Sequence, residues 1–273
     1  MSSVCDSCDG KHCEGCEHKK PQFEPQNAGS KVKNVIAVMS GKGGVGKSLS
    51  TALLASHTAK LGYKVAILDA DITGPSIPKL FGLTDMARSD GKNILPVETE
   101  NGIKVLSINL MLEDPEAPVV WRGPILGNVV KQFWTDTVWD EVDYMFIDMP
   151  PGTGDVPLTV FQSLPVDGIV MVTTPQDLVS MIVNKAVKMA EMMNVPILGV
   201  IENMSYIECP DCGKRIDLFG KSNIEKVASA HSIPVLAELP IRPILASACD
   251  KGEIEDIVVE EMMSAANYLA NIK

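Results

Sequence analysis

Residues 34–51 read Asn-Val-Ile-Ala-Val-Met-Ser-Gly-Lys-Gly-Gly-Val-Gly-Lys-Ser-Leu-Ser-Thr, and this stretch decides the fold. Residues 35–39 form an apolar run of the kind found in buried strands of parallel sheets. A glycine-rich loop follows, and residues 48–61 are then expected to form a helix. Residues 41–48 fit the phosphate-loop pattern G-x-x-x-x-G-K-S. Because the motif agrees with its strand–loop–helix context, a phosphate-binding loop is favoured over an ordinary glycine-rich turn.

The residue types of this loop suit nucleotide chemistry. Glycines let backbone N–H groups crowd around phosphate oxygens, and the start of the helix adds partial positive charge. Lys47 can reach the β- and γ-phosphates, and Ser48 can ligate Mg2+. An ordinary phosphate loop does not need the second lysine, Lys42. The residues expected to bind ATP are Gly41, Lys42, Gly43, Gly44, Val45, Gly46, Lys47, Ser48 and Leu49.

Acidic residues stand at the ends of two further predicted strands. Asp69 and Asp71 close the strand within residues 62–71, at the end where open α/β sheets place ligands. Both can approach one phosphate and metal site, although a solvated strand-end aspartate is a plausible alternative for one of them. Asp148 ends a hydrophobic strand and can reach Mg2+ through water, as a Walker B aspartate does.

Two other positions are candidates for nucleotide contact. Gly152 follows Pro150-Pro151, and its N–H could meet the γ-phosphate, so that this loop would report hydrolysis. A rigid turn is the alternative for this loop. Asn203 follows the predicted strand at 195–201 and could hydrogen-bond an adenine edge, which is a weak signal by itself.

Composition limits the classes of partner. A net charge of −11 argues against a nucleic-acid-binding patch. No apolar stretch reaches about 18 residues, so no membrane helix is expected. The first residues lack the basic start and apolar core of a signal peptide. Together with the odd count of 7 cysteines, these features predict a cytoplasmic protein that binds neither nucleic acid nor membrane.

Four cysteines lie near the N-terminus as two C-x-x-C pairs. Residues 1–30 contain few large apolar side chains and are expected to form a flexible tail, ahead of a folded domain at residues 31–273. Four thiolates this close together can surround one Zn2+ or one four-iron cluster, and their spacing does not decide between them. These cysteines are Cys5, Cys8, Cys13 and Cys16.

Cys209-x-x-Cys212 supplies only half of a four-thiolate site. A two-fold homodimer would bring a second pair to its axis and complete the set. A redox dithiol and a zinc site shared with the tail are the competing interpretations. Cys249 is expected to be a buried structural thiol.

Strands and helices alternate from residue 34 onward, which predicts an α/β fold with a mostly parallel sheet covered by helices on both faces. The tryptophans at positions 121, 134 and 139 and the methionines at 181, 189, 192 and 193 are interpreted as packing residues. Further strands are expected at 94–97, 103–108, 167–174, 195–201 and 233–239, and further helices at 121–134, 176–193, 221–231 and 258–272.

The loop Gly-Lys-Gly-Gly-Val-Gly-Lys-Ser resembles the deviant Walker A loop of the MinD/ParA/nitrogenase-iron-protein class. That resemblance implies that Lys47 acts within its own chain and Lys42 acts in trans on the partner's nucleotide. Further motifs bring the chain close to the Mrp/ApbC family of P-loop ATPases that carry iron–sulfur clusters. These motifs are Asp-Ala-Asp-Ile-Thr-Gly-Pro-Ser, Trp-Arg-Gly-Pro, Asp-Met-Pro-Pro-Gly-Thr-Gly-Asp, Glu-Asn-Met-Ser and Cys-Pro-Asp-Cys-Gly.

The family resemblance implies an ATP-hydrolysing homodimer with Mg2+ that binds a [4Fe-4S] cluster through Cys209 and Cys212 and passes it to apo iron–sulfur proteins. It assigns Asp71 to positioning the attacking water and Asp69 to the neighbourhood of the Mg2+. The tail resembles that of the eukaryotic cytosolic scaffold branch. Its compact C-x2-C-x4-C-x2-C spacing departs from the long first gap of that branch, so zinc remains an alternative there.

Three other classes share some of these features. A division or DNA-partitioning ATPase should carry a basic membrane helix or DNA patch, and neither is visible in the sequence. A nitrogenase-like reductase also bridges a cluster, but through cysteines that lie far apart in sequence. A zinc-binding regulatory ATPase of the MinD/ParA type remains the alternative function.

Overall fold

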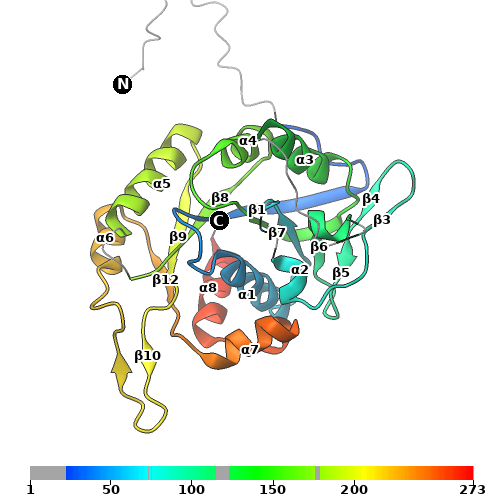
Figure 1. The fold of residues 1–273 in the computed structure, drawn as a ribbon. Helices are drawn as coiled ribbons and strands as arrows, with labels where there is room; N and C mark the ends of the chain where they lie inside the picture. The colour runs from blue at the N-terminus through cyan, green and yellow to red at the C-terminus, as the bar shows by residue number, and fades with distance from the viewer. Residues whose placement is uncertain are drawn as a thin grey trace, which may run out of the picture.

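The computed structural model describes residues 23–72, 74, 76–112, 114, 123–175 and 179–272. Within these residues, one central sheet holds eight strands. Its strands are β1 (Ser30–Ser40), β2 (Val65–Asp69), β5 (Val97–Glu98), β6 (Lys104–Leu106), β7 (Asp140–Asp148), β8 (Gly168–Thr173), β9 (Ile197–Glu202) and β12 (Val235–Glu238). Their order is β12-β9-β8-β1-β7-β2-β6-β5, and every neighbouring pair is parallel except β5 and β6. The expected mostly parallel sheet is therefore confirmed (Figure 1).

Helices cover both faces of the sheet (Figure 1). They are α1 (Lys47–Lys60), α2 (Ile77–Leu80), α3 (Gly123–Thr135), α4 (Asp155–Ser163), α5 (Val179–Met193), α6 (Ile224–Ala230), α7 (Pro243–Lys251) and α8 (Glu260–Asn271). Side chains of α3, α4, α5 and α6 belong to one buried cluster, and those of α1, α2, α7 and α8 to a second. Successive side chains of a strand point to opposite faces of the sheet, and β1 shows how this produces the two clusters. Val35 and Ala37 lie in the first cluster, and Ile36 and Val38 lie in the second.

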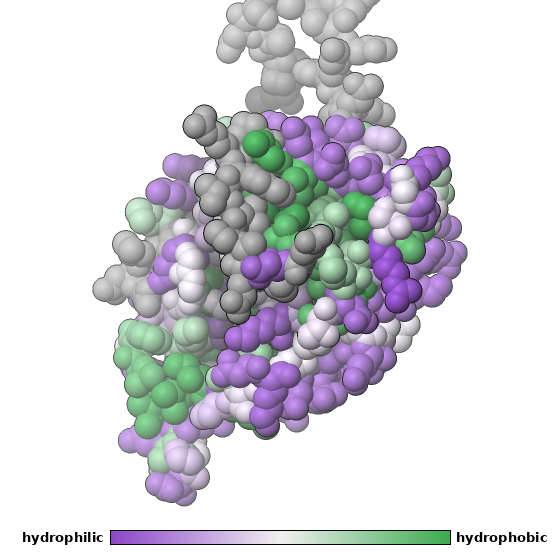
Figure 2. Space-filling model, turned by 45° about the vertical axis from the view of Figure 1, so that its right-hand side comes forward, coloured by the Kyte–Doolittle hydropathy of each residue, from purple (hydrophilic) through white to green (hydrophobic). Residues whose placement is uncertain are grey.

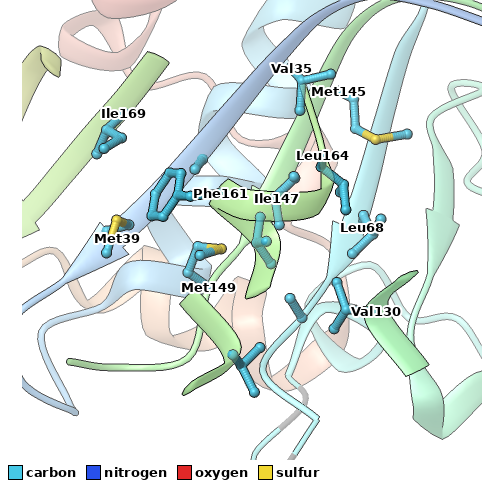
Figure 3. Packing of buried hydrophobic residues seen from close by; sticks show 14 of the residues in the cluster. Val35, Met39, Leu68, Val130, Met145, Ile147, Met149, Phe161, Leu164 and Ile169 are labelled. Atoms are coloured by element: carbon cyan, nitrogen blue, oxygen red, sulfur yellow. The ribbon is translucent and has the colours of Figure 1, made fainter. Parts of the chain in front are cut away.

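The first cluster shows how the sheet and its helices interlock. Phe161 and Leu164, at the end of α4, lie with Met39 of β1 and Ile147 of β7 in this cluster (Figure 3). Trp134 and Trp139 are fully buried, as expected, and Trp139 Nε1 donates to the Phe133 carbonyl at 3.1 Å. Trp121 lies outside the described residues.

The folded domain begins before the expected boundary at residue 30. Glu24 N donates to the Ser163 carbonyl at 2.7 Å, and the Glu24 carbonyl accepts a hydrogen bond from Trp134 Nε1 at 2.9 Å. Asn27 donates to the Thr135 carbonyl at 3.2 Å. These bonds fasten residues 24–30 to the domain, whereas residues 1–22 of the predicted tail lie outside the described residues.

Two helices, α4 and α7, were not expected from the sequence. Proline lies in the first turn of each, as Pro157 in α4 and as Pro243 at the first position of α7. Proline normally signals the end of a helix, but the first turn tolerates it because the N–H it lacks has no intrahelical partner there. The prolines therefore mask the start of each helix in the sequence.

The interpretation of the α5 methionines is half wrong. Met189 is buried and Met193 packs against the core, but Met181 and Met192 are 47% and 78% exposed. Positions 181 and 192 are eleven residues, or about three turns, apart and so share the outer face of the helix. Among the described residues, none of the helices has the length and hydrophobicity needed to cross a bilayer.

Two short antiparallel pairings lie outside the central sheet in the described part of the chain. β3 (Arg88–Ser89) pairs with β4 (Ile94–Leu95), and β10 (Ile207–Glu208) pairs with β11 (Arg215–Ile216). The β10–β11 hairpin projects from the body of the molecule (Figure 1). It carries the C-x-x-C motif at its tip, because the motif falls between the two strands.

Candidate functional site

The phosphate loop connects β1 to α1 at the carboxyl edge of the sheet. Gly44 and Gly46 have φ angles of 76° and 81°, in the left-handed region that other residues avoid. A pocket of about 350 Å3 opens beside the loop. It is lined by Ser40, Gly43, Gly44, Gly46, Lys47, Ser48, Leu49, Asp71, Gly74, Ser76, Leu80 and Pro151. The loop, the start of α1 and the segment after β2 therefore meet as the sequence predicted.

Lys47 and Asp148 form the charged centre of this site. Lys47 Nζ lies 2.8 Å from Asp148 Oδ1 and 3.4 Å from Asp71 Oδ2. Ser48 Oγ donates to Asp148 Oδ2 at 2.5 Å, and Thr51 Oγ1 donates to Asp148 Oδ1 at 2.9 Å. The acidic residues thus neutralise a lysine that is only 6% exposed. Thr51 was missed from the sequence, although its place one turn beyond Ser48 on α1 was a usable signal.

Asp69 and Asp71 have different surroundings. Asp69 lies beside Asp148 in the strand register and is fully buried, with Ser107 Oγ donating to its Oδ2 at 3.0 Å. Its Oδ1 accepts a hydrogen bond from Asp71 N at 3.1 Å. Burial, and then the nearby Asp148 charge, hold the pKa of Asp69 well above its usual range. Only Asp71 of the two lines the pocket, because β2 ends at Asp69 and the next residues turn away from the strand direction.

Gly152 belongs to the loop after β7 and has a φ angle of 86°. Its N–H donates to the Ser40 carbonyl at 2.8 Å. In this conformation the group predicted to meet a γ-phosphate is therefore bonded to the end of β1. Contact with a phosphate would require it to exchange that partner.

Asn203 lies directly behind the phosphate loop. Its Nδ2 donates to the Val45 carbonyl at 3.0 Å, and its Oδ1 accepts the Met204 N–H at 2.9 Å. The residue is 3% exposed. The adenine contact predicted for Asn203 remains a prediction, and the contact with the phosphate loop had no signal in the sequence. Lys42 is half-buried within the loop, and its carbonyl accepts a hydrogen bond from Ser40 Oγ.

The cysteine pair occupies the turn of the β10–β11 hairpin. Cys209 N donates to the Lys214 carbonyl at 3.0 Å, and Gly213 N donates to the Cys209 carbonyl at 2.8 Å. The backbone N–H groups of Asp211 and Cys212 hydrogen-bond the Cys209 sulfur and, with the Cys212 thiol, lower the pKa of Cys209. The turn therefore favours a thiolate, the form of cysteine that binds metals.

The hairpin offers two thiols and apolar surface at the edge of the molecule. Cys212 is exposed and Cys209 half-exposed. Three apolar side chains at the end of this hairpin and just beyond it are also exposed, namely Ile216, Leu218 and Phe219. Figure 2 shows apolar surface at the lower left, where the hairpin projects. Within the described ranges, no group of three or more His, Cys, Asp or Glu residues is arranged to hold a metal ion, so the pair stands there as a half-site. The predicted tail ligands Cys5, Cys8, Cys13 and Cys16 lie outside those ranges.

Curated relatives cover nearly the whole chain. An iron-sulfur cluster carrier protein from Clostridium perfringens is 50% identical over 254 residues, covering 90% of this chain and 89% of the relative. The protein of the same name from Methanocaldococcus jannaschii is 44% identical over 255 residues, covering 91% and 87%.

Solved structures agree with the fold. A nucleotide-binding protein from Archaeoglobus fulgidus in complex with ADP has a TM-score of 0.76 and 44% identity, over 84% of this chain and 90% of that one. MinD from Aquifex aeolicus, in its complex with MinC, has a TM-score of 0.63 at 21% identity over 88% and 96% of the chains, a likeness of fold alone. The family profile described as ParA, NUBPL iron-transfer P-loop NTPase, matches residues 31–273. The resemblance seen in the motifs is thereby confirmed, and the chain belongs to the family of NUBPL iron-transfer P-loop NTPases.

Proposed function

We propose that this protein is an ATPase that carries a [4Fe-4S] cluster between the Cys209/Cys212 pairs of two identical subunits and delivers it to apo iron–sulfur proteins. The observation that carries the proposal is the thiolate half-site on a projecting hairpin, in the same chain as a phosphate loop. Relatives at 44–50% identity bear the name of cluster carrier, which supports the same cargo.

Two subunits complete the cluster site. A cubane cluster takes four cysteine ligands, and each chain offers two at the hairpin tip. A two-fold axis next to the tip supplies the other two. The exposed Ile216, Leu218 and Phe219 support contact between hairpins, because pairing would cover these side chains. A cluster held at the molecular edge can also leave toward an acceptor protein.

The nucleotide site suits ATP with Mg2+. Ser48 and Asp148 present hydroxyl and carboxylate oxygens 2.5 Å apart, the donor type that Mg2+ prefers, so these two residues would hold the ion. Bound Mg2+ supplies positive charge against the β- and γ-phosphate oxygens. Asp69 would lie behind them, since Asp148 is its neighbour in the sheet.

Nucleotide binding would change the partners of Lys47 and Gly152. The Lys47 ammonium would turn from Asp148 and Asp71 to the phosphate oxygens, which frees the Asp71 carboxylate to orient the attacking water. Gly152 N–H would exchange the Ser40 carbonyl for the γ-phosphate and so distinguish ATP from ADP. Lys42 of each subunit would reach across the dimer to the partner's nucleotide, and Asn203 would additionally meet the adenine edge.

The proposal is tested by anaerobic reconstitution of the full-length chain with iron and sulfide. Cys5, Cys8, Cys13 and Cys16 are first replaced by serine, so that only the hairpin can hold iron. We expect about four irons per dimer, with the absorbance of a cubane cluster. Cys212→Ser should abolish this iron, whereas Cys249→Ser, outside the hairpin, should retain it.

Two results would overturn the carrier function. One zinc per monomer without iron would favour the zinc-binding regulatory ATPase. A cluster that survives Cys212→Ser would exclude the bridging site. Delivery itself is measured by activation of an apo iron–sulfur enzyme, which should require the loaded wild-type dimer.

A further inference from the structure

One buried carboxylate holds both ends of the cysteine hairpin. Ser205, where the chain leaves β9 for the hairpin, donates through Oγ to Glu202 Oε2 at 2.6 Å. Ser222, where the chain returns toward α6, donates through Oγ to Glu202 Oε1 at 2.6 Å. The two ends of the hairpin are thus attached to a single residue, the last of β9.

This attachment is costly to break. Glu202 has no exposed surface, and its burial raises its pKa. The two serine hydroxyls satisfy both carboxylate oxygens, and removal of either leaves a buried oxygen without that donor. The end of β9 and both ends of the hairpin should therefore move together.

The next residue holds the phosphate loop. Asn203 Nδ2 donates to the Val45 carbonyl, and a Cβ placed on Gly46 would lie only 2.1 Å from that same nitrogen. The loop and the Asn203 side chain therefore touch with no room between them, and a displacement of the loop must be passed to Asn203.

Met204, between Asn203 and Ser205, has an unusual backbone conformation. Met204 has a φ angle of 58°, in the left-handed region that costs a non-glycine residue free energy. Its N–H is held by Asn203 Oδ1 at 2.9 Å. Asn203 thus contacts the phosphate loop with one end of its amide and fixes the start of the hairpin with the other.

We propose that the turn at residues 202–205 couples the nucleotide site to the cysteine pair, with Asn203 following the phosphate loop and Glu202 transmitting its position to both ends of the hairpin. Both are positioning residues. The coupling rests on the proposed carrier function for its purpose, since it would let nucleotide state control how Cys209 and Cys212 are presented to a cluster or an acceptor.

The experiment measures thiol reactivity and needs no cluster. The full-length protein is alkylated with iodoacetamide, with and without Mg-ADP or a non-hydrolysable ATP analogue, and the rates at Cys209 and Cys212 are read by peptide mass mapping. In wild type, nucleotide should change these rates by about 5-fold or more, the usual range of coupling between sites. In Ser222→Ala the ratio of rates with and without nucleotide should approach one.

Controls separate coupling from loosening of the hairpin. Ser222 Oγ also accepts the Ile224 N–H, so its loss weakens the start of α6, and a purely structural effect would change both rates equally and preserve the ratio. Ser222→Thr keeps the hydroxyl and should restore the ratio. Ser264→Ala, on the exposed face of α8, should leave it unchanged. Ser205→Ala breaks the other attachment and gives a second measurement if Ser222→Ala does not fold.

A wild-type ratio of one with bound nucleotide would overturn the coupling, as would an unchanged ratio in both Ser222→Ala and Ser205→Ala. Isothermal titration of nucleotide confirms that each variant is loaded during labelling. Failure of the carrier function appears separately, as loss of iron binding in reconstitution, and does not alter the labelling ratio.

Discussion

Lys47 Nζ lies 2.8 Å from Asp148 Oδ1, and neither side chain is more than 6% exposed. The pair joins the start of α1 to the end of β7, two elements that lie far apart in sequence. Without phosphate, the acid compensates the lysine charge, and the lysine compensates the acid. The two residues proposed to bind the nucleotide and its Mg2+ therefore also compensate each other's charge inside the fold.

Replacement of Lys47 by alanine should remove ATP binding and also destabilise the protein. It leaves Asp148 buried without its cation, a change that costs about 3 kcal/mol or more in the free energy of unfolding. The matched control is Lys33→Ala, whose pair with Asp143 involves a lysine that is 55% exposed, so that water screens the pair and its loss should cost much less. Urea unfolding and nucleotide titration measure both effects. Equal destabilisation by the two variants would show that burial does not strengthen the Lys47 pair.

Asp71→Ala should bind ATP normally and hydrolyse it about 100-fold more slowly, since a group that orients and deprotonates water contributes a factor of this size. Asp71 lines the pocket, and its replacement removes the 3.4 Å contact with Lys47 but leaves Lys47 its closer partner, Asp148. Asp85→Ala, an exposed acid outside the nucleotide pocket, is the control and should keep the wild-type rate. Phosphate release under saturating ATP gives the rates. Similar turnover in Asp71→Ala and wild type would remove Asp71 from the hydrolytic role.

The central fold and the composition of the phosphate site were predictable from local patterns. Apolar runs with acids at their ends predict parallel strands, and parallel strands bring Lys47, Asp71 and Asp148 to one edge. The loop motif also fixed which residues occupy each position of the site, because the motif places Ser48 directly after Lys47.

Contacts between distant segments were not predictable in the same way. The Asn203–Val45 contact spans 158 positions, and no local pattern encodes which carbonyl an amide will meet. Glu202 resembles any strand-end acid until Ser205 and Ser222 are placed around it. Met192 was misassigned because hydrophobicity alone does not say which side of α5 faces water.

Lys42 offers a direct test of a shared active site. Chains with Lys42→Ala are mixed with chains with Lys47→Ala. In the mixed dimer, the nucleotide on the Lys42→Ala chain keeps its own Lys47 and receives Lys42 from the partner. ATPase activity should recover in part, up to about half of the wild-type rate if the two sites act independently.

Subunit exchange must be shown in the same experiment, for example with differently tagged chains. A second mixture, in which both changes are on one chain and the partner is wild type, is the matched control. That dimer keeps Lys47 only at the wild-type site, where Lys42 of the partner is missing, so it should have little activity. If the second mixture is instead the more active of the two, Lys42 works within its own chain, because only the wild-type chain then carries both lysines.

His57 should make stability depend on pH. Its Nε2 accepts the Val259 N–H at 2.8 Å, so the ring proton must be on Nδ1, which donates to the Leu53 carbonyl at 2.7 Å. Burial, and then the nearby Lys60 charge, lower the pKa of His57 below its ordinary value of 6.5. The folded state therefore favours the neutral ring, whereas the unfolded chain takes up a proton as the pH falls below about 6.5.

The contribution of His57 to the free energy of unfolding should thus be complete above pH 6.5 and decline as the pH falls from there toward the lowered pKa. Urea unfolding at several pH values between about 7.5 and 5.5 measures the decline. Other buried acids also titrate, so the quantity to compare is the difference between wild type and His57→Gln, whose amide can accept and donate at the same two positions without taking up a proton. That difference should shrink on acidification because wild type alone loses stability through this site. A difference that is constant or grows as the pH falls would show that His57 is not held neutral by the fold.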